Sequence, residues 1–115
     1  MSMLSVRMAT PSDLKSLSEL FDGYRRFYLQ PSDIERARDF ISERMARNDS
    51  WILVAQQNDE LLGFCQLYPS FSSTQTSRIA ILNDLYVAES ARTQGVGRAL
   101  MRAAVWRVGK ELDLQ

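Results

Sequence analysis

The chain has 115 residues, and its 14 basic and 14 acidic side chains cancel to a formal net charge of zero. This length fits one small domain, residues 1–115, and 45% hydrophobic against 24% charged residues excludes wholesale disorder. The sequence contains no histidine, which excludes Ser-His-Asp and Cys-His catalysis and the commonest zinc ligand.

The first half of the chain predicts one strand and two helices. Residues 4–8 alternate apolar and polar side chains, which indicates a short strand with one buried face. Threonine and proline at residues 10–13 are typical of a helix start, and Gly23 is expected to end this helix. A second helix opens at residues 31–35, where Ser32 and Glu35 have the spacing of a capping box. The apolar stripes of the two helices are Leu14, Leu17, Leu20 and Phe21, then Ile34, Ala37, Ile41 and Met45.

The second half predicts a hairpin, a third strand and a long helix. Residues 51–56 and 60–68 form the hairpin, residues 69–77 a loop, and residues 78–87 the third strand. The polar pair Asn83-Asp84 interrupts that apolar strand. Residues 95–110 form the helix, and residues 111–115 alternate again like the start of another strand. The fold class is therefore α/β (α+β), in the order β-α-α-β-β-β-α.

The most informative segment joins the third strand to the last helix. Gly95 and Gly97 stand at the helix start, where unpaired backbone N–H groups and the helix dipole favour an anion. Between Glu89 and Glu111 there is no acidic residue, whereas five basic ones occur, namely Arg92, Arg98, Arg102, Arg107 and Lys110. The segment predicts a phosphate-binding loop. A tight turn before a helix with basic residues is the alternative reading.

Other glycine-rich motifs fit this segment less well. A P-loop requires Gly-Lys-Ser/Thr, and here Arg98-Ala99 follows the second glycine. The dinucleotide fingerprint requires a third glycine where Leu100 stands.

The segment Arg92-Thr93-Gln94-Gly95-Val96-Gly97 resembles the Arg/Gln-x-x-Gly-x-Gly/Ala signature of GCN5-related N-acetyltransferases, the GNAT family. Leu85-Tyr86-Val87 resembles the strand that precedes this signature, and the element order agrees over nearly the whole chain. Residues 27–28, 66–69 and 82–85 look most like the small bacterial members described as similar to histone acetyltransferase Hpa2.

The resemblance implies acetyl transfer from acetyl-coenzyme A to an amine in a ternary complex. It places the pyrophosphate on the loop from Arg92 to Arg98, namely Arg92, Thr93, Gln94, Gly95, Val96, Gly97 and Arg98. The pantetheine arm is expected to pair with Leu85, Tyr86 and Val87. A bulge at Asn83-Asp84 is expected to expose an amide that polarises the thioester carbonyl. The resemblance implies no metal.

Amine acetylation requires a base, because an ammonium has no lone pair with which to attack. Asp84 is the best-placed carboxylate, acting directly or through a water. Its alternative role is to hydrogen-bond backbone at the bulge. Tyr24, Phe27, Tyr28 and Tyr68 are the candidate acceptor-binding residues, with core packing as the alternative for each. Cys65 is expected to be a small buried residue and not a nucleophile.

Family members usually continue with a fifth strand and further elements that supply an acid for the leaving thiolate. The sequence predicts a fold cut off before or within that strand, which leaves open a homodimer that completes the sheet across its interface. The alternative function is an acyl-coenzyme A-binding or dimer-assembly module without turnover.

The expected acceptor is a small-molecule amine or a protein lysine. Nucleic-acid binding by the arginine-bearing helix is a third possibility that the neutral net charge argues against. The single cysteine predicts a cytoplasmic location, and no apolar run is long enough to predict a membrane partner.

Overall fold

The computed structural model describes residues 3–113 of the chain. The order of elements is the expected one, and the α/β class is confirmed. The elements are β1 (Ser5–Met8), α1 (Leu14–Phe27), α2 (Ile34–Arg47), β2 (Trp51–Gln57), β3 (Glu60–Ser72), β4 (Ser77–Val87) and α3 (Val96–Asp113), with short 3-10 turns at Pro11–Asp13 and Glu89–Ala91.

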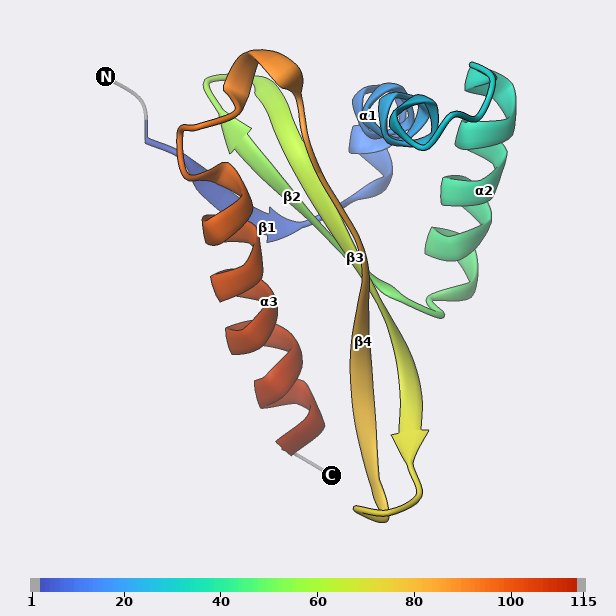
Figure 1. Ribbon diagram of the computed structural model, residues 1–115, viewed down its shortest axis with the longest axis vertical. Coiled ribbons are helices and arrows are strands. Elements are labelled where there is room, and N and C mark those ends of the chain that lie inside the picture. Colours follow the sequence, from blue (N-terminus) through green and yellow to red (C-terminus); the bar gives the residue numbers. More distant parts are fainter. Residues whose placement is uncertain (1–2, 114–115) are drawn as a thin grey trace.

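The described strands form one antiparallel sheet in the order β1-β2-β3-β4. The helices cover both faces of this sheet, α3 on one side and α1 with α2 on the other (Figure 1). Side chains alternate between the two faces along β2, because successive residues of a strand point in opposite directions. Leu53 and Ala55 pack toward α3, while Ile52 and Val54 pack toward α1 and α2. The sheet is therefore buried on both faces at its centre.

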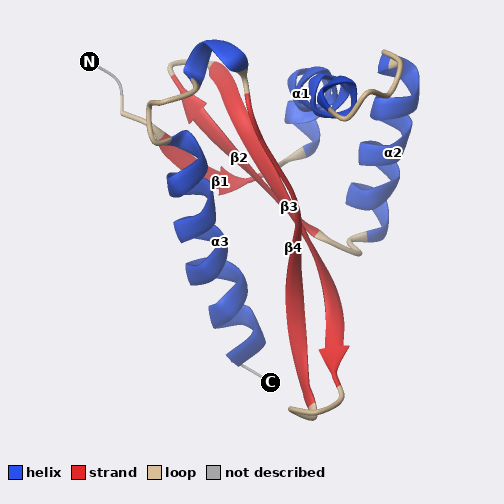
Figure 2. Ribbon diagram, viewed as in Figure 1, coloured by secondary structure: helices blue, strands red, loops and turns tan. Residues whose placement is uncertain are grey.

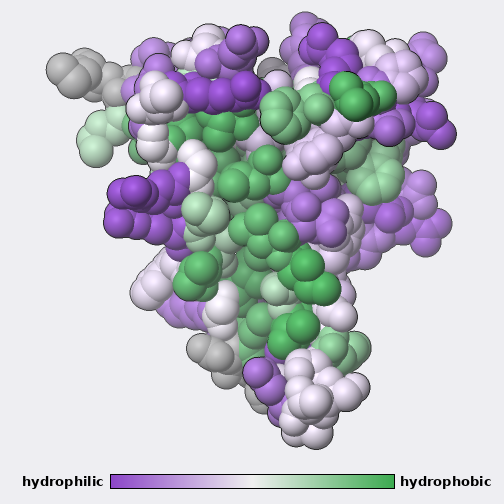
Figure 3. All heavy atoms as spheres, in the orientation of Figure 1, coloured by the Kyte–Doolittle hydropathy of each residue, from purple (hydrophilic) through white to green (hydrophobic). Residues whose placement is uncertain are grey.

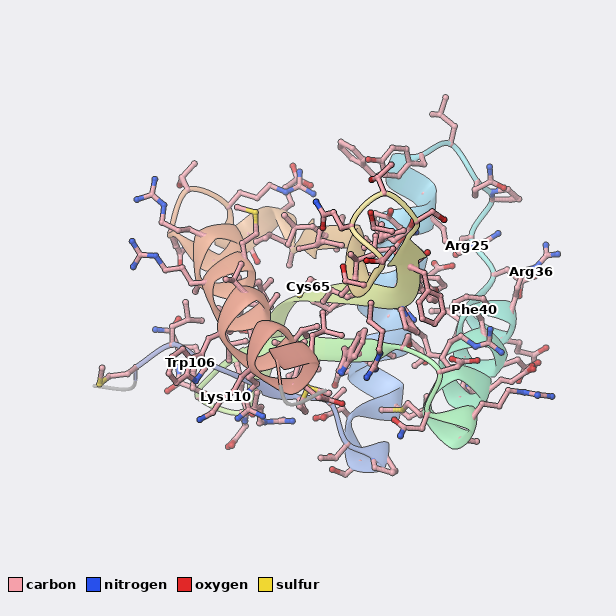
Figure 4. All side chains as sticks on the ribbon, turned by 90° about the horizontal axis from the view of Figure 1, so that it is seen from below. Arg25, Arg36, Phe40, Cys65, Trp106 and Lys110 are labelled. Atoms are coloured by element: carbon pink, nitrogen blue, oxygen red, sulfur yellow. The ribbon has the colours of Figure 1, made fainter. Side chains whose placement is uncertain are left out.

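The α3 side of the core is built from the predicted stripe of the last helix. Val96, Leu100, Ala104 and Val108 are almost fully buried there, and Ala103 packs at the margin. On the opposite face, the buried residues of the helices are Leu17, Phe21, Ala37 and Ile41. Cys65 is buried on the sheet beneath α3, and burial raises the pKa of its thiol to about 11, which fits a packing role (Figure 4).

The predicted bulge in β4 is present. Gln66 pairs with Asp84 and Leu67 with Leu82, so Asn83 is the extra residue on the bulged strand. Near the end of β4, the backbone of Tyr86 lies close to Gly63 of β3. A Cβ on Gly63 would lie 2.7 Å from the backbone oxygen of Tyr86, so only glycine fits there.

The expectation that Gly23 ends the first helix is wrong. Helix α1 continues through Gly23 to Phe27, and Gly23 is buried inside it. A Cβ at this position would lie 2.8 Å from the hydroxyl oxygen of Tyr86. The glycine therefore serves close packing between α1 and β4, at a cost in helix propensity of about 1 kcal/mol.

The start of the second helix is also misplaced by the sequence prediction. Asp33, not Ser32, is the N-cap of α2, and its carboxylate accepts a hydrogen bond from the backbone N–H of Arg36. The Ser32 hydroxyl donates instead to the buried carboxylate of Asp22, at 2.7 Å. This contact ties the α1–α2 connection to the side of α1. On the helix itself, Ile34 is exposed while the rest of the predicted stripe is at least partly buried.

Two boundaries in the second half differ from expectation. Residues 69–72 and 77 belong to strands, so β3 and β4 form a long hairpin that projects beyond the helices (Figure 2). Residues 111–113 continue α3 and are not the start of a strand. Leu112 follows Val108 by one helical turn and packs against the same core. Residues 114–115 of that predicted strand lie outside the described residues.

A band of apolar surface runs over α3 and β4 on the face shown in Figure 3. The exposed large apolar side chains of these two elements are Ile81, Leu82, Met101, Val105 and Trp106. Trp106 and Lys110 lie on the outer side of α3 (Figure 4), where the ammonium of Lys110 stands over the indole ring. None of the helices in the described part of the chain is both long and apolar enough to cross a bilayer.

Candidate functional site

An open cavity of about 350 Å³ lies where the end of β4 faces the end of α1. Helix α1 and the residue that follows it contribute three aromatic side chains to the wall, and the last three residues of β4 and the following loop contribute the rest. The lining residues are Tyr24, Phe27, Tyr28, Leu85, Tyr86, Val87 and Arg92. The fold thus brings together three of the four predicted acceptor-binding residues, the predicted pantetheine strand and the first residue of the predicted pyrophosphate loop.

The aromatic wall is formed by rings that contact one another. Tyr24 packs edge-on against Tyr28 and against Tyr86, with ring centroids 5.2 and 6.1 Å apart, and Phe27 packs edge-on against Tyr28. Tyr86 can lie this deep because Gly23 has no side chain. The cavity is therefore pre-formed by packing between α1 and β4.

Arg92 lies across this cavity. Its guanidinium carbon is 5.7 Å from the ring centroid of Phe27 and 5.5 Å from that of Tyr86. Its Nε donates a hydrogen bond of 3.0 Å to the backbone oxygen of Val87. These contacts hold a positive charge against two aromatic faces at the mouth of the site.

Asp84 is buried at the bulge and is bonded to a residue of the cavity wall. The hydroxyl of Tyr24 donates to Asp84 Oδ1 at 2.7 Å, and the side-chain amide of Asn83 donates to the same oxygen at 3.1 Å. Burial, followed by the hydrogen bond and charge of Asp84, raises the pKa of Tyr24 well above its ordinary value. Tyr24 therefore stays protonated at neutral pH and links the cavity to the carboxylate.

Gln66 is a polar residue that the sequence prediction did not assign to catalysis. It is fully buried opposite Asp84, and its Nε2 donates to the hydroxyl of Ser50 at 3.0 Å. Among the described residues, its Oε1 has no hydrogen-bond partner. The available signal was a lone polar side chain in the apolar run of residues 61–67, directly across from the bulge.

Tyr68 stands apart from the other candidate acceptor residues. It belongs to β3, where it pairs with Ile81, and it does not line the cavity. Because side chains alternate along β3, Tyr68 lies on the same face of the sheet as Gln66, which pairs with Asp84. Burial and the nearby charge of Asp84 raise the pKa of the Tyr68 hydroxyl.

The glycine loop leaves open space around its backbone. Gly95 has φ +80°, a left-handed conformation that favours glycine, and a Cβ there would meet nothing within 4 Å. A Cβ on Gly97 would meet only the side chain of Val87, at 3.8 Å. The carbonyl of Gly95 accepts the first bond of α3, from Ala99, so the N–H groups at the start of this helix point into that space.

The electrostatics of this end of the molecule favour an anion. Arg92, Arg98 and Arg102 are exposed around the helix start, and α3 adds the positive end of its dipole. No group of three or more metal-ligating side chains occurs among residues 3–113. The arrangement can bind a phosphate-bearing ligand beside an aromatic cavity that reaches a buried carboxylate.

Comparison with known proteins places the chain among acetyltransferases. The model of the acetyltransferase (GNAT) family matches residues 15–114. An uncharacterized N-acetyltransferase of Bacillus subtilis, YhfO, is 46% identical over 101 residues, which cover 88% of this chain and 68% of that protein. The aminoglycoside N(6')-acetyltransferase type 1 of Klebsiella aerogenes is 36% identical over 75 residues, covering 63% of this chain and 49% of that protein.

The fold comparison agrees. A crystal structure described as that of a probable acetyltransferase superimposes with a TM-score of 0.85 and 44% sequence identity, and covers 95% of this chain and 73% of that one. The chain spans between 49% and 68% of the length of the curated relatives it matches.

Proposed function

This chain belongs to the acetyltransferase (GNAT) family, and we propose that it transfers an acetyl group from acetyl-coenzyme A directly to a primary amine while both substrates are bound. One observation carries the proposal. A single cavity is shared by the end of β4, by Arg92 of the glycine loop and by the aromatic residues of α1. A thioester and an amine would meet there.

The residues present fit coenzyme A. The empty space around Gly95 and Gly97 lets an anion reach the backbone N–H groups at the start of α3, and a side chain at Gly97 would project into that space beside Val87. Among the described strands β4 pairs only with β3, so its other edge leaves backbone groups for the pantetheine amides at Leu85, Tyr86 and Val87. Thr93, Gln94, Val96 and Arg98 would complete the diphosphate cradle.

In the proposed reaction, the amine nitrogen bonds to the acyl carbon of acetyl-coenzyme A as the C–S bond breaks, and coenzyme A leaves as its thiolate, which takes a proton from water. This chain's residues handle the amine's proton and the developing negative charge. Asp84 acts as the base through the Tyr24 hydroxyl: Tyr24 takes the amine's proton and passes its own to Asp84 Oδ1, which is 2.7 Å away. Asn83, the extra residue of the bulge, interrupts the regular pairing of β4. A backbone amide freed there would stabilise the oxyanion.

The acceptor would enter between Tyr24, Phe27 and Tyr28, which line the cavity on the α1 side. Tyr68 contributes from the Asp84 side of the sheet. The cavity of about 350 Å³ has the size of a small-molecule site, near the lower end of that range, so we propose a small-molecule amine ahead of a protein lysine as the acceptor. We also propose a cytoplasmic location, which the single cysteine supports. The homodimer is a further part of the proposal.

A second candidate function is a coenzyme A-binding or assembly module without turnover. It is favoured by the apolar band on α3 and β4, since exposed apolar patches of this kind mark association surfaces. A homodimer is compatible with this second function as well.

One experiment distinguishes the two candidates. Coenzyme A affinity is measured by calorimetry, and thiol release from acetyl-coenzyme A is then followed with a panel of amines. The transferase proposal expects coenzyme A binding and amine-dependent thiol release. Binding without release for every amine supports a coenzyme A-binding module. Absence of coenzyme A binding contradicts the transferase and the coenzyme A-binding module and leaves only an assembly role.

A further inference from the structure

The side chain of Arg92 contacts two groups that the substrates would need to contact. Its Nε is bonded to the backbone oxygen of Val87, an acceptor on the strand edge where the pantetheine would pair. Its guanidinium covers the aromatic rings of Phe27 and Tyr86 in the wall of the acceptor cavity. Within residues 3–113 its charge has no carboxylate at salt-bridge distance. The rings and the Val87 carbonyl are therefore what hold this cation.

Both contacts are weaker than the contact that a diphosphate would offer. A cation over an aromatic face contributes about 0.5–2 kcal/mol, and its hydrogen bond to a neutral carbonyl is of ordinary strength. An arginine–phosphate pair is charge-assisted and often bidentate, and such bonds are about twice as strong as neutral ones. Arg92 is the first residue of the loop that would hold the diphosphate, so its side chain can exchange one partner for the other.

We infer that Arg92 covers the Phe27 and Tyr86 rings of the acceptor cavity as a stand-in cation, that diphosphate binding draws it off those rings, and that the uncovered rings then receive a monocationic amine with an apolar or aromatic body. This inference rests on the proposed function and names its acceptor class. The aromatic walls already bind one organic cation, the guanidinium of Arg92, and an alkylammonium can take the same faces.

The composition of the cavity wall sets the charge of the acceptor. Apart from Arg92, its lining consists of aromatic and aliphatic side chains, with no carboxylate among them. The nearest route to a negative charge is the Tyr24 hydroxyl, which leads to the single carboxylate of Asp84. One positive charge can be matched in this way, whereas the several ammonium groups of an aminoglycoside would lose hydration without partners. The similarity to an aminoglycoside acetyltransferase therefore does not extend to this acceptor site.

A coupling between the two substrates follows. Coenzyme A that removes Arg92 from the rings makes room for the amine, so each ligand must raise the affinity of the other by the same factor. Loss of the Arg92 side chain should remove the obstruction without any coenzyme A.

Calorimetric titration tests the inference on the full chain. Phenethylamine is the probe, 2-phenylethanol is its uncharged analogue and kanamycin is the polycation, each titrated with and without saturating coenzyme A. We expect coenzyme A to tighten phenethylamine binding by about tenfold or more. 2-Phenylethanol and kanamycin should bind at least about tenfold more weakly than phenethylamine to the coenzyme A complex.

Four variants locate the effect. Arg92→Leu and Arg92→Gln should bind phenethylamine without coenzyme A about as tightly as the unsubstituted chain does with it. Phe27→Leu should weaken phenethylamine binding about three- to thirtyfold in the presence of coenzyme A. Arg36→Leu, which removes an exposed arginine on α2 that does not line the cavity, should behave like the unsubstituted chain.

The outcomes separate the inference from the function on which it rests. An unsubstituted chain that binds coenzyme A but shows the same phenethylamine affinity with and without it overturns the inference alone. Kanamycin binding tighter than phenethylamine overturns the acceptor class. Failure of coenzyme A itself to bind, seen in its own titration, overturns the proposed function.

Discussion

Gly23 and Gly109 both lie in helices, and we expect alanine substitution at these two positions to change the stability of the chain in opposite directions. Gly23 lies inside α1 against Tyr86, and Gly109 lies inside α3 with nothing within 4 Å of the position its Cβ would take. Alanine at either position gains helix propensity, worth about 0.5–1 kcal/mol. At Gly109 that gain is all we expect, so Gly109→Ala should stabilise the chain.

Gly23→Ala should destabilise the chain despite the same gain. Its Cβ would lie 2.8 Å from the Tyr86 hydroxyl oxygen and 3.3 and 3.4 Å from two ring carbons, where real Cβ atoms essentially never come within 3.0 Å of another heavy atom. Overpacking of this kind costs about 1–3 kcal/mol. Subtraction of the helix gain leaves a net loss of up to roughly 2.5 kcal/mol, and displacement of Tyr86 should also disturb the cavity wall.

Urea denaturation of the single variants, of Tyr86→Phe and of the double variant Gly23→Ala/Tyr86→Phe measures these terms. Removal of the hydroxyl takes away the closest contact, so the double variant should lose less free energy of unfolding than the two single losses added together. A Gly23→Ala chain as stable as Gly109→Ala would refute the reasoning, because it would show that α1 and β4 are not in close contact at Tyr86.

Three other substitutions give predictions of different kinds. Asp84→Asn should lower the acetylation rate about 10²- to 10⁴-fold with coenzyme A affinity unchanged, whereas an unchanged rate with a lower Tm would assign Asp84 to holding the bulge. Gly95→Ala should cost about 1–2 kcal/mol in urea denaturation because φ is +80°, and a gain in stability would contradict the left-handed assignment. Hydrogen bonds from Arg7 lower the pKa of Asp13 from 3.8 to about 2, so this carboxylate stabilises the fold above about pH 4 and the contribution is lost as the pH falls toward 2. Asp13→Asn should therefore lose up to about 2 kcal/mol at neutral pH and show a shallower acid decline in Tm, and an unchanged decline would contradict the assignment.

The element order and the location of the bulge could be predicted from the sequence because both depend on local patterns. Apolar periodicity along the chain identifies the strands and helices, and a polar pair inside an apolar strand marks the place where regular pairing fails. The pairing of Gln66 with Asp84 and of Leu67 with Leu82 puts the irregularity at that pair.

The errors arose where a distant residue decides a local structure. Glycine is typical of a helix end, but Gly23 stands inside α1 because it packs closely against Tyr86 of β4. Ser32 has the sequence position of an N-cap, but its hydroxyl donates its hydrogen bond to the carboxylate of Asp22. Pro69 predicts a loop, yet it is accommodated in β3 because, among the described strands, that part of β3 pairs with β4 alone.

In the candidate site too, some features follow from local sequence patterns and others depend on packing between distant elements. The glycine loop and the aromatic residues of α1 are visible in the sequence, and three of those aromatics line the cavity. The hydrogen bond between Tyr24 and Asp84 and the position of Arg92 over two rings depend on how α1 packs against β4. No local pattern in the sequence contains that packing.

The claim that backbone N–H groups around Gly97 hold the diphosphate of coenzyme A is tested most directly by the coenzyme A affinity of Gly97→Val. A Cβ there has room within the fold, since it would meet only Val87 at 3.8 Å, and Gly109→Val carries the same change on the same helix away from the loop. Loss of two charge-assisted hydrogen bonds of about 1.5–3 kcal/mol each predicts affinity at least roughly a hundredfold weaker for Gly97→Val, with Gly109→Val within about twofold of the unsubstituted chain. Equal affinity of Gly97→Val and the unsubstituted chain would contradict the account.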